Sequence, residues 1–199
     1  MTLLVCLSWL LAVPYWEAAP GEWTEQQLID LLTNSPWAQS APDTGRTVSP
    51  GPPVVIYLAS AAPMRQAEDE LLRRRFKQQT DIYAAVRDAR EEYLAYLAEN
   101  AGKVIVVAVP LHPEALADAG ETKRMIAESL LKIGKRKWKS TGHFPPTPSD
   151  PVLRLIFPRD IPADAKEINV EVYLPSLPGP YRNAQFRVKD LTLRGVPEL

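Results

Sequence analysis

KVIVVAV, residues 103–109, is the stretch that decides the fold, because its apolar and mostly β-branched side chains follow one another without polar alternation. A short run of this kind predicts a strand that is covered on both faces and lies inside a sheet. A second β-branched run, VVIYLA at residues 54–59, predicts another strand upstream. The chain between these two runs has a helical pattern.

Two helices are predicted there, over residues 63–79 and 81–100, because apolar residues recur at helical spacing. The expected apolar positions are Met64, Ala67, Leu71 and Leu72 in the first helix, and Ile82, Val86, Ala89, Tyr93 and Leu97 in the second. On the first helix, Asp69 and Glu70 each precede an arginine by four residues, a spacing typical of ion pairs on a solvated face.

A short capped helix is predicted before the first strand. Thr24 and Gln27 have the spacing of a capping box. Trp23 and Leu28 have the spacing of a hydrophobic staple. The segment 39–53 is rich in Ser, Thr, Gly and Pro and is predicted to be a loop.

Downstream of residue 109 the pattern changes from helical to alternating. A helical turn is predicted over 113–119, a helix or a strand over 121–132, and a loop over 142–151. Alternating apolar residues from Leu153 onward predict strands to the end of the chain. Together these patterns predict an α+β fold with one mixed, mainly antiparallel sheet, packed by two or three helices and ending in a C-terminal β-meander.

The first sixteen residues, MTLLVCLSWLLAVPYW, carry no charge and lead into a Pro, Ala and Gly-rich stretch. This pattern predicts a signal peptide over residues 1–18 and a periplasmic or secreted protein, although the basic residues that normally open a signal are missing. The apolar run is shorter than the roughly 20 residues that a membrane span requires. A buried N-terminal strand or helix is the alternative. Residues 19–53 then hold the capped helix and the Pro/Ser/Gly-rich loop, and residues 54–199 form a single α+β domain.

Composition argues against several classes of function. The 199 residues carry a formal net charge of −1, so nucleic acid is not an expected partner. The glycines belong to no phosphate-binding motif, which leaves no reason to expect a nucleotide cofactor. The only cysteine, Cys6, lies in the predicted signal, so the mature domain is expected to be stabilised by packing without disulfides. The oligomeric state is left open.

Few residues stand in patterns that carry chemistry. His112 and His143 lie near prolines in predicted loops, and no cluster supplies the three or four ligands of a zinc site. Ser60 follows a strand and precedes a helix, as a hydrolase nucleophile does, but alanines replace the flanking glycines of that motif. We therefore interpret Ser60 as a helix N-cap. The consecutive carboxylates at 68–70 are matched with arginines and are interpreted as a solvated face.

The strongest local signal is a run of basic residues around Trp138. Its members are Lys132, Lys135, Arg136, Lys137 and Lys139. Such a patch could contact an anionic partner, for example lipid headgroups, a cell-wall polymer or an acidic protein surface. Lysines on an edge strand also discourage pairing between sheets, and we favour this second interpretation because the run is short for a polybasic site.

Four segments form a recognisable combination across most of the mature chain. They are Trp23-Thr24, NSPWA at 34–38, APMRQA at 62–67, and the terminal FRVKDL at 186–191 with Gly195, Glu198 and Leu199. In this combination the chain resembles a group of uncharacterised exported single-domain proteins of soil bacteria of the acidobacterial type. The resemblance implies an exported protein without an assigned activity, and it provides no catalytic residues to transfer.

Two classes of function remain open. The favoured one is an exported, non-catalytic domain that binds a protein or a cell-envelope component. The alternative is an extracytoplasmic hydrolase with an unrecognised acidic or serine site, which perturbed acids in one pocket with Ser60 or His112 would support. A third interpretation, an intracellular adaptor, follows if the apolar N-terminus belongs to the core.

Overall fold

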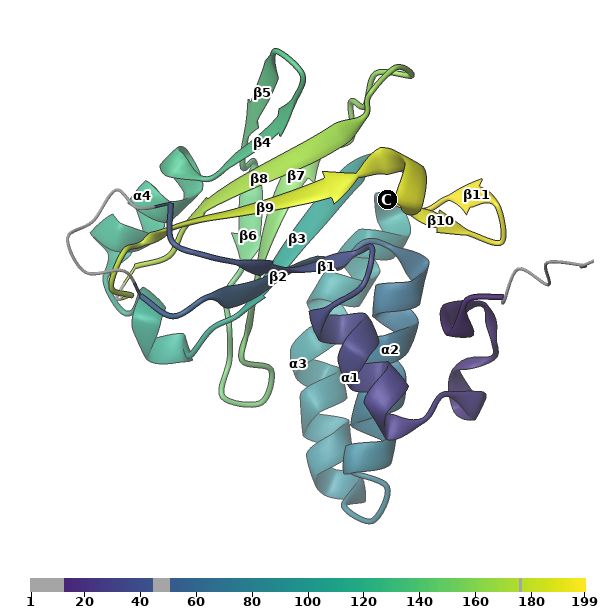
Figure 1. The fold of residues 1–199 in the computed structure, drawn as a ribbon. Helices are drawn as coiled ribbons and strands as arrows, with labels where there is room; N and C mark the ends of the chain where they lie inside the picture. Colours follow the sequence, from purple (N-terminus) through teal and green to yellow (C-terminus); the bar gives the residue numbers. More distant parts are fainter. Residues whose placement is uncertain (1–12, 45–50, 176) are drawn as a thin grey trace, which may run out of the picture.

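The computed structural model describes residues 13–44, 51–175 and 177–199, which form α-helices and antiparallel sheets (Figure 1). The α-helices are α1 (Glu25–Thr33), α2 (Ala62–Arg75), α3 (Thr80–Glu99) and α4 (Ala119–Glu128). The strands are β1 (Ala38–Ala41), β2 (Val54–Leu58), β3 (Val104–Pro110), β4 (Leu130–Ile133), β5 (Arg136–Lys139), β6 (Gly142–Phe144), β7 (Val152–Pro158), β8 (Glu167–Tyr173), β9 (Tyr181–Arg187), β10 (Thr192–Leu193) and β11 (Val196–Pro197). The 3-10 turns are η1 (Tyr15–Glu17), η2 (Pro20–Glu22), η3 (Pro113–Leu116) and η4 (Val188–Asp190). The α+β class predicted from the sequence is confirmed.

The larger strands form two sheets where the sequence led us to expect a single mixed one. The first sheet has the order β1-β2-β3-β7-β6 and the second the order β5-β4-β8-β9, while β10 and β11 make a separate small hairpin. All the strand pairs of the described residues are antiparallel. β3 is the central strand of the first sheet, as predicted. The C-terminal strands are divided between the sheets, because β7 pairs with β3 along its length whereas β8 and β9 form a hairpin beside β4.

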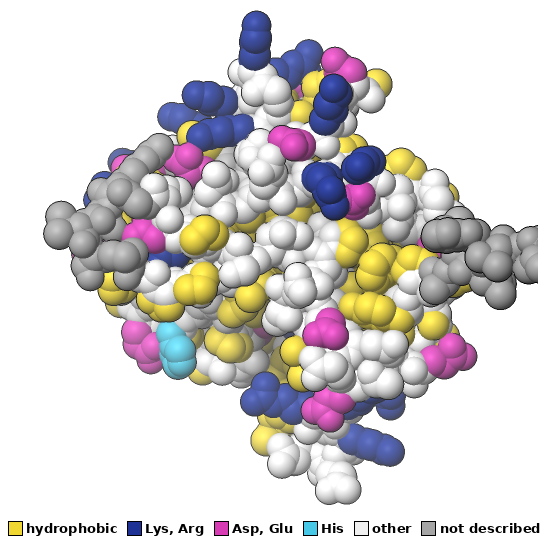
Figure 2. Space-filling view, in the orientation of Figure 1, with side chains coloured by type: hydrophobic (Ala, Val, Ile, Leu, Met, Phe, Trp, Pro, Cys, Tyr) yellow, Lys and Arg dark blue, Asp and Glu magenta, His cyan; other side chains and the backbone are white. Residues whose placement is uncertain are grey.

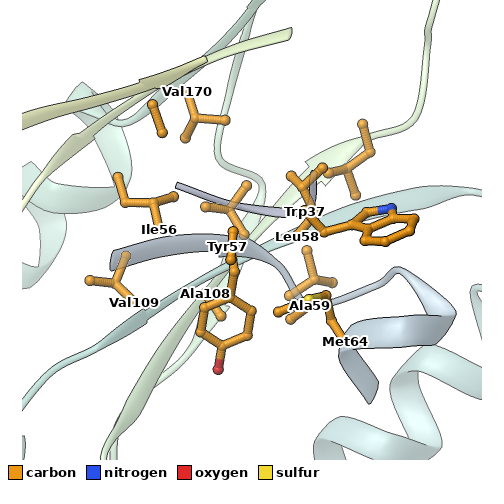
Figure 3. Close-up of a cluster of buried hydrophobic side chains, with 14 of the residues drawn as sticks. Trp37, Ile56, Tyr57, Leu58, Ala59, Met64, Ala108, Val109 and Val170 are labelled. Atoms are coloured by element: carbon orange, nitrogen blue, oxygen red, sulfur yellow. The ribbon is translucent and has the colours of Figure 1, made fainter. Parts of the chain in front are cut away.

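The two sheets enclose a common core. On one side, the segment just after β1 meets β9 in an isolated antiparallel bridge between Asp43 and Arg182. On the other side, the chain runs from β5, at the edge of the second sheet, into β6, at the edge of the first. In Figure 3, Ile56 of β2 points toward Val170 of β8, and the neighbouring Tyr57 points the opposite way, toward the helices. Alternation along β2 therefore leaves one face of the first sheet for the second sheet and one for the helices.

α1, α2 and α3 lie side by side next to the helix-facing side of the first sheet (Figure 1). α1 begins with the predicted capping box: the Thr24 hydroxyl accepts from the Gln27 N–H at 3.1 Å, and the Gln27 side chain accepts from the Thr24 N–H at 2.8 Å. Trp23 and Leu28, the predicted staple, are both buried. The helix is therefore fixed at its start by its own sequence.

The predicted apolar stripe of α3 is correct at three of its five positions. Val86, Tyr93 and Leu97 are buried. Ile82, however, is 47% exposed and Ala89 is also exposed. In place of Ala89, the buried face of the helix includes Arg90, which is only 3% exposed. A charged side chain at such a position requires buried partners, which are described below.

Two segments predicted to be loops contain short strands. The segment 39–53 includes most of β1, which pairs with β2, and the segment 142–151 begins with β6, which pairs with β7. Neither short strand is rich in β-branched residues, so intrinsic propensity does not favour a strand at either place. Both segments are strands because they pair with a longer neighbouring strand. The segment 121–132, for which helix and strand were both open, holds most of α4 and the start of β4.

The described end of the predicted signal peptide packs against the domain. The Trp16 ring meets the buried Trp37 ring edge to face, with 5.8 Å between centroids. The indole N–H of Trp23 donates to the Tyr15 carbonyl at 2.8 Å. The turn η1 is therefore part of the folded core in the full chain, while residues 1–12, most of the predicted signal, lie outside the described residues.

Candidate functional site

A row of four residues crosses the helix-facing side of the first sheet. Strand pairing places Tyr57, Ala108, Arg154 and Phe144 opposite one another in adjacent strands. Directly opposed residues of antiparallel strands project to the same face, so Arg154 points to the helix layer as Tyr57 does. The Arg154 guanidinium lies over the ring of Tyr93 from α3, 4.4 Å from its centroid. An arginine is thus placed between the sheet and the helices.

Glu68 of α2 meets this row from the helix layer and is only 8% exposed. The Tyr57 hydroxyl donates to its Oε1 at 2.5 Å, and Arg90 of α3 donates to its Oε2 at 2.6 Å. Arg154 donates to the same carboxylate at 3.3 Å and to Asp150 at 2.6 Å. We call the four charged residues Glu68, Arg90, Arg154 and Asp150 the buried charge network. Its two cations are matched by two carboxylates.

The buried charge network changes the acid–base behaviour of its surroundings. Burial raises the pKa of Tyr57 well above its ordinary value, and the charge of Glu68 raises it further. The same two causes raise the pKa of Tyr93. Burial is the largest single influence on Arg154 and lowers its pKa, but its neighbours Glu68, Tyr57 and Asp150 act together with Tyr93 to outweigh burial, so the pKa of Arg154 is raised. At neutral pH both tyrosines therefore stay protonated and act as hydrogen-bond donors.

The interpretation of the three consecutive carboxylates of α2 as a solvated face is wrong for Glu68 and Glu70, which are only 8% and 6% exposed. A spacing of four residues between opposite charges looks the same whether or not another element covers the helix, and here α3 and β7 cover it. Asp69 is 59% exposed and binds Arg90 at 3.1 Å, not the arginine four residues further along. Glu70 does bind Arg74 at 2.6 Å, as predicted.

A cavity of about 410 Å³ opens beside the buried charge network, among α1, α2 and the loop that leads into β7. Its apolar walls come from Ile29, Leu32, Val55, Leu71, Leu72, Phe76, Pro110, Pro151 and Val152. The four members of the network also line it, together with Arg75 at the end of α2. A concave site of this size, mostly apolar with a few convergent polar groups, is the usual form of a ligand pocket.

A larger groove of about 960 Å³ is more open and more polar. It is lined by the N-terminal segment, the end of α1 and the second sheet, with Trp16 among its residues. Several of its polar groups are paired within the groove: Gln185 donates to Glu167 at 2.5 Å, and Arg187 donates to Asp190 at 2.6 Å. We regard the 410 Å³ cavity as the stronger candidate, because uncovered apolar surface is what a ligand gains most by burying.

Ser60 is not the N-cap of α2, contrary to the prediction. Its Oγ accepts from the Val106 N–H of β3 at 3.1 Å, so the hydroxyl extends the contact between β2 and β3. The N-cap residue is Ala61, and the free N–H of Ala62 donates to the Glu198 carboxylate at 3.2 Å. Ser60 also lines a small cavity of about 150 Å³, where the described lining residues include no histidine to act as its base.

The predicted basic run lies on the β4–β5 hairpin, and β5 is an edge strand of the second sheet. Lys and Arg side chains gather at this end of the molecule, at the top of Figure 2. Lys132 binds Glu171 at 2.7 Å and Arg136 binds Asp160 at 3.1 Å. The remaining members, all exposed, are Lys135, Lys137 and Lys139. The edge position agrees with protection against sheet pairing, and an anionic partner for this run stays a prediction.

The two histidines lie apart from the cavity. His112 is exposed beside Glu114, and His143 is on β6, where burial lowers its pKa. Within the described ranges, no three His, Cys, Asp or Glu side chains are placed to hold a metal ion. None of the helices described there combines the length and the apolar character that crossing a membrane requires.

Comparisons of the chain with protein-family models, with curated proteins and with solved structures find no match. The resemblance to exported proteins of soil bacteria therefore stays a prediction. The cavity and the buried charge network are the features of the described residues that bear on function.

Proposed function

We propose that this chain is an exported, non-catalytic domain that binds a protein or a cell-envelope component through the 410 Å³ cavity. The cavity itself is the observation that supports the proposal, because its apolar walls are uncovered. A catalytic site needs a group that is free to take or give a proton. Glu68 accepts instead from Tyr57, Arg90 and Arg154, and Asp150 accepts from Arg154. The site therefore offers contact area and not reactive groups.

A cavity-filling substitution tests the binding site. Leu72 lines the cavity from α2, so Leu72→Trp should occupy much of its volume. We expect the wild-type protein to bind the uncharged fluorescent probe N-phenyl-1-naphthylamine saturably and the variant to lose this binding. Ile82→Trp, at a 47% exposed position of α3 outside the cavity, is the matched control and should bind the probe as the wild type does. Probe binding that Leu72→Trp leaves unchanged would remove the cavity from the proposal.

Export is supported by the uncharged N-terminal run and is tested separately. The full chain is expressed in a bacterial host, the periplasmic fraction is isolated, and the intact mass of the product is measured. We expect a periplasmic product that has lost the leader; a full-length cytoplasmic product would contradict export. The mass also locates the cut, because cleavage after Ala18 would remove Tyr15 and Trp16 from their contacts with the domain.

A further inference from the structure

The unmatched charge at the cavity is positive. The carboxylates of Glu68 and Asp150 both accept from arginines. Three arginines and two carboxylates line the cavity in all. Arg90 and Arg154 are matched by these carboxylates, and Arg90 also binds Asp69 outside the lining, so the positive excess of the lining is the charge of Arg75. Electrostatic complementarity then favours a ligand with a negatively charged end.

Among the described residues, Arg75 is the one cation of the cavity lining that pairs with no carboxylate. It closes a run of three arginines at the end of α2, of which Arg73 and Arg74 both bind Glu70. Within the described residues, no carboxylate lies within ion-pair distance of Arg75. Its guanidinium lies 5.7 Å from the ring centroid of Phe76, a wall residue of the cavity, and its side chain is exposed. A free cation is therefore held at the border between the apolar wall and the solvent.

We propose that the cavity binds one unbranched acyl chain and that Arg75 binds the carboxylate at the end of this chain. The inference rests on the proposed function and specifies its ligand as a single-chain carboxylate. The chain covers the apolar walls at Leu32, Leu72 and Val55, and the gain comes from the apolar area removed from water. The carboxylate stays at the exposed border, where its desolvation is small and where Arg75 offers two parallel donors.

The chemistry of the head group separates this ligand from others of the same shape. A cationic head would meet the positive excess of the lining and find its carboxylates already bound to arginines. An uncharged head would gain the apolar contact but leave Arg75 without a partner. The position of charge therefore predicts an order of affinity, carboxylate over hydroxyl over quaternary ammonium, for ligands that share one chain.

Three twelve-carbon compounds test this order on the full-length protein. Dodecanoate, dodecanol and dodecyltrimethylammonium are each titrated, below their aggregation limits, against N-phenyl-1-naphthylamine bound to the wild-type protein. We expect all three to displace the probe, with dodecanoate the tightest. Arg75→Gln should weaken dodecanoate about threefold to fivefold, the range of an exposed ion pair, and leave dodecanol unchanged. The matched control is Arg87→Gln, an exposed arginine of α3 outside the cavity, which should change neither.

The other possible results distinguish a failure of this proposal from a failure of the proposed function. Equal affinities for the three heads, or an Arg75→Gln variant that binds dodecanoate normally, would overturn the assignment of the carboxylate while leaving the cavity as a binding site. A probe that none of the three compounds displaces would overturn the acyl-chain ligand and leave the proposed function standing. A probe that does not bind the wild-type protein at all would overturn both.

Discussion

Replacing Glu68 by glutamine tests whether the buried charge network acts as a desolvated unit. Glu68→Gln keeps the shape of the side chain but removes the charge that Arg90 meets at 2.6 Å and Arg154 at 3.3 Å. A hydrogen bond to a charged group contributes roughly 1.5–3 kcal/mol, and breaking a buried ion pair costs roughly 3–5 kcal/mol. Because Arg90 keeps Asp69 and Arg154 keeps Asp150, we expect the free energy of unfolding to fall by about 3 kcal/mol.

The assay is urea unfolding followed by tryptophan fluorescence, in which the midpoint should fall with an unchanged slope. Asp69→Asn is the matched control, because it removes a carboxylate that binds the same Arg90 but is 59% exposed; it should cost less than about 1 kcal/mol. Combining Glu68→Met, Arg90→Leu and Arg154→Met with Tyr57→Phe and Asp150→Asn should recover most of the stability lost in Glu68→Gln, because the apolar side chains need no buried partners and neither the Tyr57 hydroxyl nor the Asp150 charge is left without one. A loss in Glu68→Gln no larger than in Asp69→Asn would refute the reasoning.

Three further predictions concern other parts of the fold. Hydrogen bonds from two neighbouring arginines lower the pKa of Glu70 to about 2 from its ordinary 4.5, so its stabilising effect is complete above about pH 4.5 and is lost as the pH falls toward 2. The two arginines are partly exposed, so the contribution of Glu70 to the free energy of unfolding is reduced to about 1–2 kcal/mol. It is measured by comparing the urea midpoints of wild type and Glu70→Gln at pH 2 and at pH 7. Ser60→Ala should cost about 1–2 kcal/mol in the same unfolding assay, because the Val106 N–H then loses its acceptor; a neutral effect would mean that water replaces the hydroxyl. In the full, uncleaved chain, Trp16→Ala should lower stability by about 2 kcal/mol through lost ring contact with Trp37, and an unchanged thermal midpoint would show that η1 contributes little to the core.

The helices and strands of this fold were predictable where a local sequence pattern is compatible with only one structure. The run at 103–109 is apolar on both faces, and it does form the central strand of a covered sheet. The capping box at Thr24 needs only residues of its own helix, and it forms as expected. The number of sheets was not predictable in this way, because the pairing of β7 with β3 rather than β8 joins segments about fifty residues apart.

The candidate site was hidden because its residues look ordinary one at a time. Glu68 lies within a charged helix face, and its burial depends on what covers that face. Arg154 is the signal that was missed: it interrupts the apolar run VLRLIF at 152–157, for which only alternation from Leu153 was predicted, and residues 153–157 are in fact all buried. A charge in such a strand needs a partner of opposite charge, which is a reason to search the neighbouring helices for a buried carboxylate. That search would have led to α2, although not to Glu68 in particular.

One face of α2 connects the core, the buried charge network and the cavity on successive turns. Met64 is completely buried, Glu68 follows four residues later in the network, and Leu72 and Arg75 follow in turn along the wall of the cavity. Residues three and four apart lie on one side of a helix, so this order runs from packed core to solvent along a single line. Stability and binding are therefore assigned to different turns of the same helix. Substitution of Glu68 should lower the urea midpoint of unfolding. Arg75→Gln, at the exposed end of the helix, should instead weaken the binding of dodecanoate and leave the urea midpoint unchanged.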